Sequence, residues 1–110
     1  MEWKKLTSAA QWSEILERSY KKPQVIYKHS PRCSISSVVK SRLERGDRAP
    51  DIDFYFLDVI ADRGLSRAIA EDMRVVHESP QVLLIRGGAC VYNESHGAIM
   101  MDEILEKSGA

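Results

Sequence analysis

The sequence has few cysteines, few aromatic residues and no excess of charge. Its 110 residues include two cysteines and 7% aromatic residues, and 16 Lys and Arg balance 16 Asp and Glu. Two cysteines cannot build a disulfide-dense secreted scaffold, and no cysteine–histidine cluster has the spacing of a zinc site. A net charge of zero creates no long-range field that attracts nucleic acid or anionic lipid. The composition therefore indicates no metal, no nucleic acid, and a partner that is small or bound through a local patch.

Long apolar runs are also missing. One of the longest, Val82–Ile85, is far too short to cross a bilayer, and the first residues lack the apolar stretch of a signal peptide. We therefore expect a soluble cytoplasmic protein with no membrane partner, in which a cysteine ordinarily stays a thiol. The length is below the roughly 150 residues of an average domain, so residues 1–110 are expected to form one domain.

The pattern of apolar and β-branched residues predicts alternating helices and strands. A first helix ends before Pro23, and strands are expected at 24–28 and 52–59 with a helix between them. Because a helical crossover joins these two strands, they should be parallel. Two more β-rich runs flank Gly87-Gly88 and predict a hairpin. The order αβαβαββα predicts a three-layer α/β/α sandwich around a four-stranded mixed sheet.

Each helix should bury one apolar stripe. The residues expected to be apolar and inward-facing are Trp12, Ile15, Leu16 and Tyr20 in the first helix, Ile35, Val38, Val39 and Leu43 in the second, and Leu65, Ala68, Ile69 and Met73 in the third. A last helix is expected to start at His96-Gly97 and to turn Ile104 and Leu105 inward.

Cys33 is expected where the first strand ends and the second helix begins. The free amides of a first helical turn and the positive end of the helix dipole stabilise an anion, and the anionic form of a thiol is the reactive one. The alternative is a small apolar residue in the core. Its neighbours Ser30, Pro31, Arg32 and Ser34 are typical of a solvated turn, and they favour the reactive thiol.

The fourth position of the motif Cys33-Ser34-Ile35-Ser36 is a serine. A dithiol redox enzyme needs a second cysteine there to resolve the mixed disulfide formed by the first. Ser36 cannot do so, and a mixed disulfide at Cys33 must await an external thiol. This indicates chemistry on small-thiol adducts rather than on internal protein disulfides.

These residues resemble the thioredoxin superfamily, and specifically the YtxJ-type monothiol bacilliredoxins of the bacillithiol system. The resemblance covers nearly the whole chain and depends on the segments 28–36, 79–81 and 91–96. It implies that Cys33 takes bacillithiol from bacillithiolated client proteins in cell redox homeostasis, with bacillithiol as co-substrate and no tightly bound cofactor. It also implies that Ser79-Pro80 forms a cis-proline loop that binds substrate, although a trans proline is the commoner form in general. The family commonly has proline directly after the cysteine, and here Ser34 adds a backbone N–H and loses rigidity.

Other residues near the motif are candidates for supporting roles. Lys28 and Arg32 could stabilise the thiolate or bind the malate carboxylates of bacillithiol, and both could equally be solvated charges. The motif residues Ser34, Ile35 and Ser36 are included in the expected site. His96 and Gly97 are expected to contact the ligand through the amides of the last helix.

Two residues are expected to be structural. His29 could share a proton with the thiol, but its position on a strand favours a structural role. Cys90 follows the hairpin turn and should lie about 17 Å from the active-site end of its neighbouring strand, too far for a disulfide to Cys33.

Two alternatives to the enzyme remain open at this stage. One is a thioredoxin-fold module that binds a protein or an iron–sulfur partner without turnover, although the serine after the cysteine weakens this analogy. The other is a passive redox sensor that becomes S-thiolated.

Overall fold

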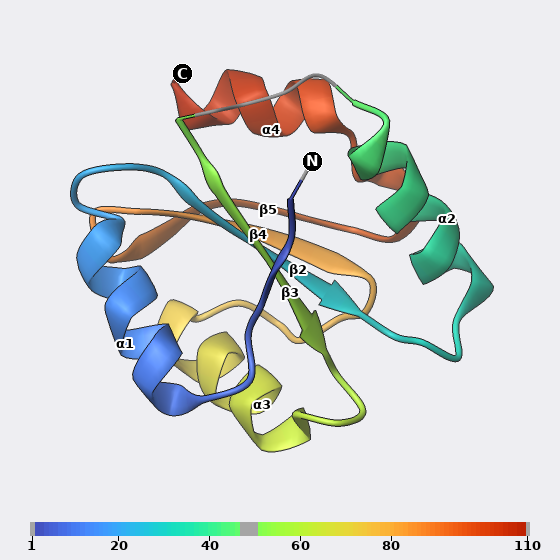
Figure 1. Cartoon of the computed structure of the whole chain (residues 1–110), viewed down its shortest axis with the longest axis horizontal. Coiled ribbons are helices and arrows are strands. Elements are labelled where there is room, and N and C mark those ends of the chain that lie inside the picture. Colours follow the sequence, from blue (N-terminus) through green and yellow to red (C-terminus); the bar gives the residue numbers. More distant parts are fainter. Residues whose placement is uncertain (1, 47–50, 110) are drawn as a thin grey trace.

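The computed structural model describes residues 2–46 and 51–109 and contains a sheet flanked by helices (Figure 1). In chain order the elements are β1 (Lys4–Lys5), α1 (Ala9–Arg18), β2 (Gln24–His29), α2 (Ser34–Glu44), β3 (Asp53–Asp58), α3 (Arg63–Met73), β4 (Gln81–Arg86), β5 (Ala89–Ser95), the short 3₁₀ helix η1 (His96–Ala98) and α4 (Met101–Ser108). Within this described part, no helix has the length and apolar character that crossing a membrane requires.

The sheet has the strand order β1-β3-β2-β4-β5. Strands β2 and β3 are parallel, as the helical crossover predicts, and β4 runs antiparallel to β2. The hairpin of β4 and β5 turns at Gly87 and Gly88, whose φ angles of 59° and 77° suit glycine in particular. The mixed sheet is therefore confirmed, but the expected number of four strands is wrong. The fifth strand, β1, has only two exposed lysines, which is too short for an apolar alternation to reveal it.

The helices cover the sheet in two pairs, which confirms the three-layer α/β/α arrangement (Figure 1). Val25 and Tyr27 of β2 pack in the core beneath α2 and α4, whereas Ile26 packs in the core beneath α1 and α3. Successive residues of a strand point to opposite faces, so β2 contributes to both cores. The first core also takes in Val39, Leu43, Met101 and Ile104, and the second takes in Trp12, Ile15, Leu57 and Ile69.

Several expected stripe residues are not buried. Ile35 and Val38 of α2 are 50% and 57% exposed, because α2 buries Ser36 together with Val39 and Leu43. Tyr20 lies beyond the end of α1 and is 73% exposed. In α3, Ser66 and Ala70 are buried in place of Ala68, which is exposed. The apolar pattern identified these helices but misplaced part of the face that each one buries.

The predicted start of the last helix is also wrong. His96 has a left-handed φ of 58°, which a continuous α-helix does not accommodate, and residues 96–98 form the 3₁₀ turn η1. The α-helix begins five residues later, at Met101.

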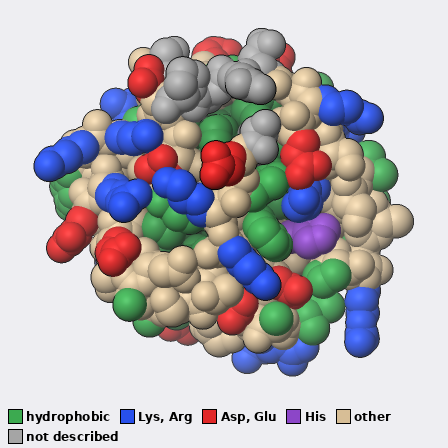
Figure 2. Space-filling view, viewed as in Figure 1, with side chains coloured by type: hydrophobic (Ala, Val, Ile, Leu, Met, Phe, Trp, Pro, Cys, Tyr) green, Lys and Arg blue, Asp and Glu red, His purple; other side chains and the backbone are tan. Residues whose placement is uncertain are grey.

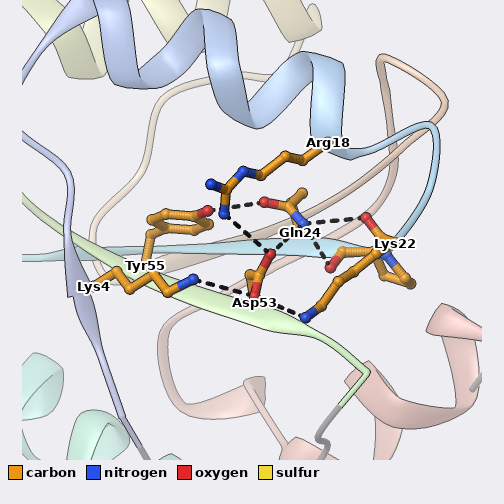
Figure 3. A network of polar contacts seen from close by, with 7 residues as sticks. Lys4, Arg18, Lys22, Gln24, Asp53 and Tyr55 are labelled. Atoms are coloured by element: carbon orange, nitrogen blue, oxygen red, sulfur yellow. Dashed lines mark hydrogen bonds and ion pairs between the residues drawn. The ribbon is translucent and has the colours of Figure 1, made fainter.

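A buried carboxylate joins four elements at the end of the sheet where β2 and β3 begin (Figure 3). Asp53 lies 3.1 Å from Lys22 Nζ and 3.3 Å from Lys4 Nζ, and it accepts a 2.9 Å hydrogen bond from Gln24 Nε2. Arg18 lies 4.0 Å away. Burial by itself would raise the pKa of Asp53, but the bonds from Gln24, Lys22 and Lys4 outweigh it and hold the pKa below its usual value.

One face of the molecule carries charges of both signs. Figure 2 shows basic and acidic side chains interspersed over one face of the molecule, as the balanced composition leads one to expect.

Asp53→Asn should destabilise the protein by about 1–3 kcal/mol at pH 7, because it removes a charged acceptor from a buried network. A carboxylate whose pKa is lowered by folding stabilises fully above its unfolded pKa, near 3.9, and loses this contribution as pH falls. The difference between wild type and variant should therefore shrink below about pH 4. Urea unfolding across this pH range measures it, with the exposed Asp51→Asn as the control. Equal stability of both variants at pH 7 would contradict the role of Asp53.

Candidate active site at the first turn of α2

Cys33 is the N-cap residue of α2 and is half-buried. Its N–H donates to Ser30 O at 3.1 Å, which closes the turn after β2, and its C=O accepts from Ser37 N at 3.3 Å, which starts the helix. The side chain makes no capping hydrogen bond. Cys33 thus occupies the helix N-cap that the sequence predicted, and helix N-termini are sites that favour anions in general.

Ser36 connects the helix to the strand. Its buried Oγ lies 2.8 Å from His29 Nδ1 and 3.1 Å from Tyr27 Oη, and it accepts a 3.0 Å hydrogen bond from Ser30 N. Tyr27 Oη also donates to Ser36 O at 2.7 Å. The fourth position of the motif, where a dithiol enzyme has its second cysteine, therefore holds the turn of Cys33 in place.

The two aromatic partners of Ser36 both have shifted pKa values. Burial raises the pKa of Tyr27 to about 12; the hydrogen bond with Ser36 opposes this shift, and the nearby Cys33 adds to it. Burial, together with the positive charge of Lys40, lowers the pKa of His29. A neutral imidazole suits a hydrogen bond with a hydroxyl. The hydrogen bond of His29 is thus with Ser36, and its structural role stays a prediction. Tyr27 was missed because an isolated tyrosine in a strand gives no functional signal.

The peptide bond between Ser79 and Pro80 is cis, as the family resemblance implied. Gln81, the first residue of β4, pairs with Lys28 near the end of β2. The cis-proline loop and the Cys33 turn thus lie at the same edge of the sheet. Pro80 O accepts a 2.9 Å hydrogen bond from His96 N, and Ser79 Oγ is buried without a hydrogen-bond partner among the described residues.

His96 and Gly97 also lie at this edge, but in a different element from the one expected. They belong to η1 rather than to the first turn of α4, so they do not offer the amides of an α-helix terminus. Arg42 of α2 donates to Gly97 O at 2.9 Å and to Ile99 O at 3.0 Å, which holds η1 against α2. No sequence motif had indicated a role for Arg42. The exposed His96 has Nε2 3.8 Å from Glu78 Oε1.

The side chain of Lys28 does not lie where the sequence placed it, beside the Cys33 thiol. Because Lys28 follows Tyr27 in a strand, it points to the opposite face of the sheet. Its fully buried Nζ lies 3.0 Å from Ser66 O and 3.1 Å from His77 Nδ1. Burial lowers its pKa to about 8.

The remaining candidates divide between the surface and the far end of the sheet. Arg32, Ser34 and Ile35 are exposed around Cys33. Cys90 pairs with Ile85 at the opposite end of β4, and burial raises the pKa of its thiol. Both cysteines are free, and this separation agrees with the prediction that Cys90 does not resolve Cys33.

The sequence of this chain also matches a known protein family. The family described as monothiol bacilliredoxin BrxC matches residues 4–104. The chain belongs to this family. Bacilliredoxins are thiol redox proteins, and the serine at the fourth position of the motif is consistent with a monothiol member of the family.

Solved structures agree with this assignment. A protein described as a candidate oxidoreductase with a thioredoxin fold is 33% identical, with a TM-score of 0.82, and the match covers 94% of this chain and 90% of the other. The thioredoxins of Malassezia sympodialis and Fasciola hepatica both have TM-scores of 0.77, at 14% and 16% identity. These matches cover 97% and 96% of the bacilliredoxin chain and 91% and 96% of the thioredoxins, and they show the thioredoxin fold.

Ser36→Ala should destabilise the protein by about 1–3 kcal/mol, because Ser30 N loses its acceptor and His29 Nδ1 loses its hydrogen-bond partner. Ser34→Ala, on the exposed side of the same turn, is the matched control and should change stability by less than about 0.5 kcal/mol. Chemical denaturation measures both. Equal effects of the two substitutions would show that Ser36 does not anchor the turn.

Lys28→Met removes a buried charge and keeps most of the side-chain volume. Because the folded pKa of about 8 lies below the ordinary 10.5, the unfolded chain holds more protons between these values. The stability of the wild type relative to the variant should therefore rise between pH 8 and pH 10.5, by up to about 3 kcal/mol. Unfolding at several pH values measures the difference. A constant difference across this range would contradict the lowered pKa.

Proposed function

We propose that this bacilliredoxin removes bacillithiol from S-bacillithiolated client proteins through Cys33. The observation that carries the proposal is a single half-buried thiol at the N-cap of α2, with Ser36 in place of a resolving cysteine. Such a thiol can accept a small thiol by disulfide exchange and cannot release it internally.

The reaction is two thiol–disulfide exchanges. In the first, the Cys33 thiolate attacks the bacillithiol sulfur of the client mixed disulfide. The client–bacillithiol S–S bond breaks, a Cys33–bacillithiol disulfide forms, and the client thiolate leaves and takes up a proton. In the second, the thiolate of another bacillithiol attacks the bacillithiol sulfur on Cys33. Cys33 returns as thiolate, and bacillithiol disulfide is the product, so the electrons balance.

The surroundings of Cys33 support roles in substrate binding. The backbone beside the cis Ser79–Pro80 bond lies at the same edge of the sheet as the thiol, and η1 with His96 and Gly97 borders it. Arg32 is exposed next to the thiol and is suited to a carboxylate of the substrate, and Ser34 and Ile35 lie on the accessible side of α2.

The test uses a bacillithiolated protein, bacillithiol as reductant, and three forms of the bacilliredoxin. Wild type should release the client thiol, Cys33→Ala should reduce the rate to that of bacillithiol alone, and Cys90→Ala should retain the wild-type rate because Cys90 is at the far end of β4. Mass spectrometry should detect a bacillithiol adduct on Cys33 during turnover. Equal rates for wild type and Cys33→Ala would refute the proposal, and an adduct that forms without client release would instead indicate a passive sensor.

A further inference from the structure

A pocket lies on the face of the sheet opposite to α2, beside the loop that follows β3. Its volume is about 210 Å³, and it is lined by Val59, Ile60, Arg63, Ser66, Arg67 and His77. These residues come from the β3–α3 loop, from the first two turns of α3, and from the segment before the cis-proline loop.

The polar wall of this pocket is cationic. Arg63 and Arg67 are four residues apart on α3, so they lie on the same face of the helix, where like charges repel. Within the described residues, neither arginine forms an ion pair. The protein as a whole has no net charge, so this pocket concentrates positive charge that its own side chains do not neutralise.

A buried ammonium lies directly behind the same wall. Lys28 Nζ contacts Ser66 O and His77 Nδ1, and both of these residues line the pocket. Both contacts are with uncharged groups, and no carboxylate pairs with Lys28 in the described parts of the chain. A buried cation without a counter-charge is costly, and an anion in the pocket would lower that cost.

His77 completes the set of donors. An ammonium group can only donate, so His77 Nδ1 accepts from Lys28, and a neutral imidazole then carries its proton on Nε2. Two acidic groups nearby, Glu78 and Asp58, have other contacts. Glu78 lies 3.8 Å from His96, and Asp58 Oδ1 accepts from Ile60 N and Ala61 N.

The pocket is joined to the turn of Cys33 by a short series of hydrogen bonds. Val59 N, in the pocket wall, donates to His29 O at 3.0 Å. The ring of His29 bonds to Ser36 Oγ, which also accepts from Ser30 N, and Ser30 O accepts from Cys33 N. Ligands of open α/β sheets bind at the edge where parallel strands end, and here β2 and β3 both end between the thiol and the pocket.

From these contacts we propose that the pocket of Arg63, Arg67 and His77 binds the dicarboxylate end of the low-molecular-weight thiol that Cys33 exchanges. The inference rests on the proposed function for the identity of that thiol, in which malate provides two carboxylates. Two arginines one turn apart and an imidazole N–H offer several donors to such a group, and arginine pairs with carboxylates through two parallel hydrogen bonds.

The binding test uses reduced, ¹⁵N-labelled wild-type protein titrated with L-malate and, separately, with inorganic phosphate. Malate should shift the amide signals of residues 59–67 and 77. In an Arg63→Gln, Arg67→Gln double variant, the dissociation constant for malate should rise about tenfold. Arg45→Gln, at the exposed C-cap of α2, is the matched control and should bind malate like the wild type. Absence of shifts, or equal shifts in the double variant, would overturn the proposal, and stronger binding of phosphate would overturn the assignment to a dicarboxylate.

The kinetic test links the pocket to the reaction. The double variant should raise KM for a bacillithiolated protein severalfold and leave kcat close to that of the wild type, because the arginines bind the substrate away from the reacting sulfur atoms. An unchanged KM would overturn the link to the thiol substrate. Malate binding does not require thiol chemistry. If Cys33 is inactive but malate binds, the proposed function fails; if Cys33 is active but malate does not bind, the pocket assignment fails.

Discussion

The structure depends on strand β2, which lies in the middle of the sheet and is covered by helices on both faces. A buried strand normally consists of apolar residues, yet four of the six residues of β2 are polar or carry a hydroxyl. A buried polar group needs a partner, so each of these side chains must be satisfied by another element. Gln24 binds Asp53, Tyr27 and His29 bind Ser36, and Lys28 binds Ser66 and His77. Strand β2 therefore positions β3, α2 and α3 by hydrogen bonds as well as by packing.

These contacts form two clusters, one at each end of β2. At the start of β2, Asp53 draws β1, α1 and β3 together through charge-assisted bonds (Figure 3). At the end of β2, the chain turns through Ser30 to Cys33, and the cis-proline loop and η1 approach from β4 and β5. Ser36 is at the centre of this second end. Ser36, the serine in place of a second cysteine, thus also holds the geometry of the Cys33 turn.

The alternation of β2 also explains why the Cys33 turn and the cationic pocket are on different faces of the sheet. Tyr27 and His29 face α2 and the thiol, whereas Lys28 between them faces α3 and its arginines. Under the proposed function, this bacilliredoxin brings the sulfur of Cys33 and an anionic small thiol together. The thiol at the N-terminus of α2 and the cationic pocket at the same edge of the sheet, on its other face, suit these two tasks. Neither task requires a net charge on the whole protein.

Much of this could be determined from the sequence by itself, because it depends on local patterns. The parallel pair β2 and β3, the hairpin at Gly87 and Gly88, and the place of Cys33 at a helix terminus follow from apolar periodicity, turn residues and motif spacing. The serine at position 36, where a dithiol enzyme has its second cysteine, could also be recognised from the sequence.

The sequence could not reveal β1, because two lysines pair with β3 only after the chain has folded back. Lys28 was expected beside the thiol because it is near Cys33 in the sequence. Successive residues of a strand point to opposite faces of the sheet, however, so Lys28 points away from the face of Tyr27 and His29. The tertiary structure alone decided that Ile35 and Val38 stay exposed, that Arg42 holds η1, and that Arg63, Arg67 and His77 meet at one pocket. Each of these depends on which distant elements pack together, and no local pattern contains that information.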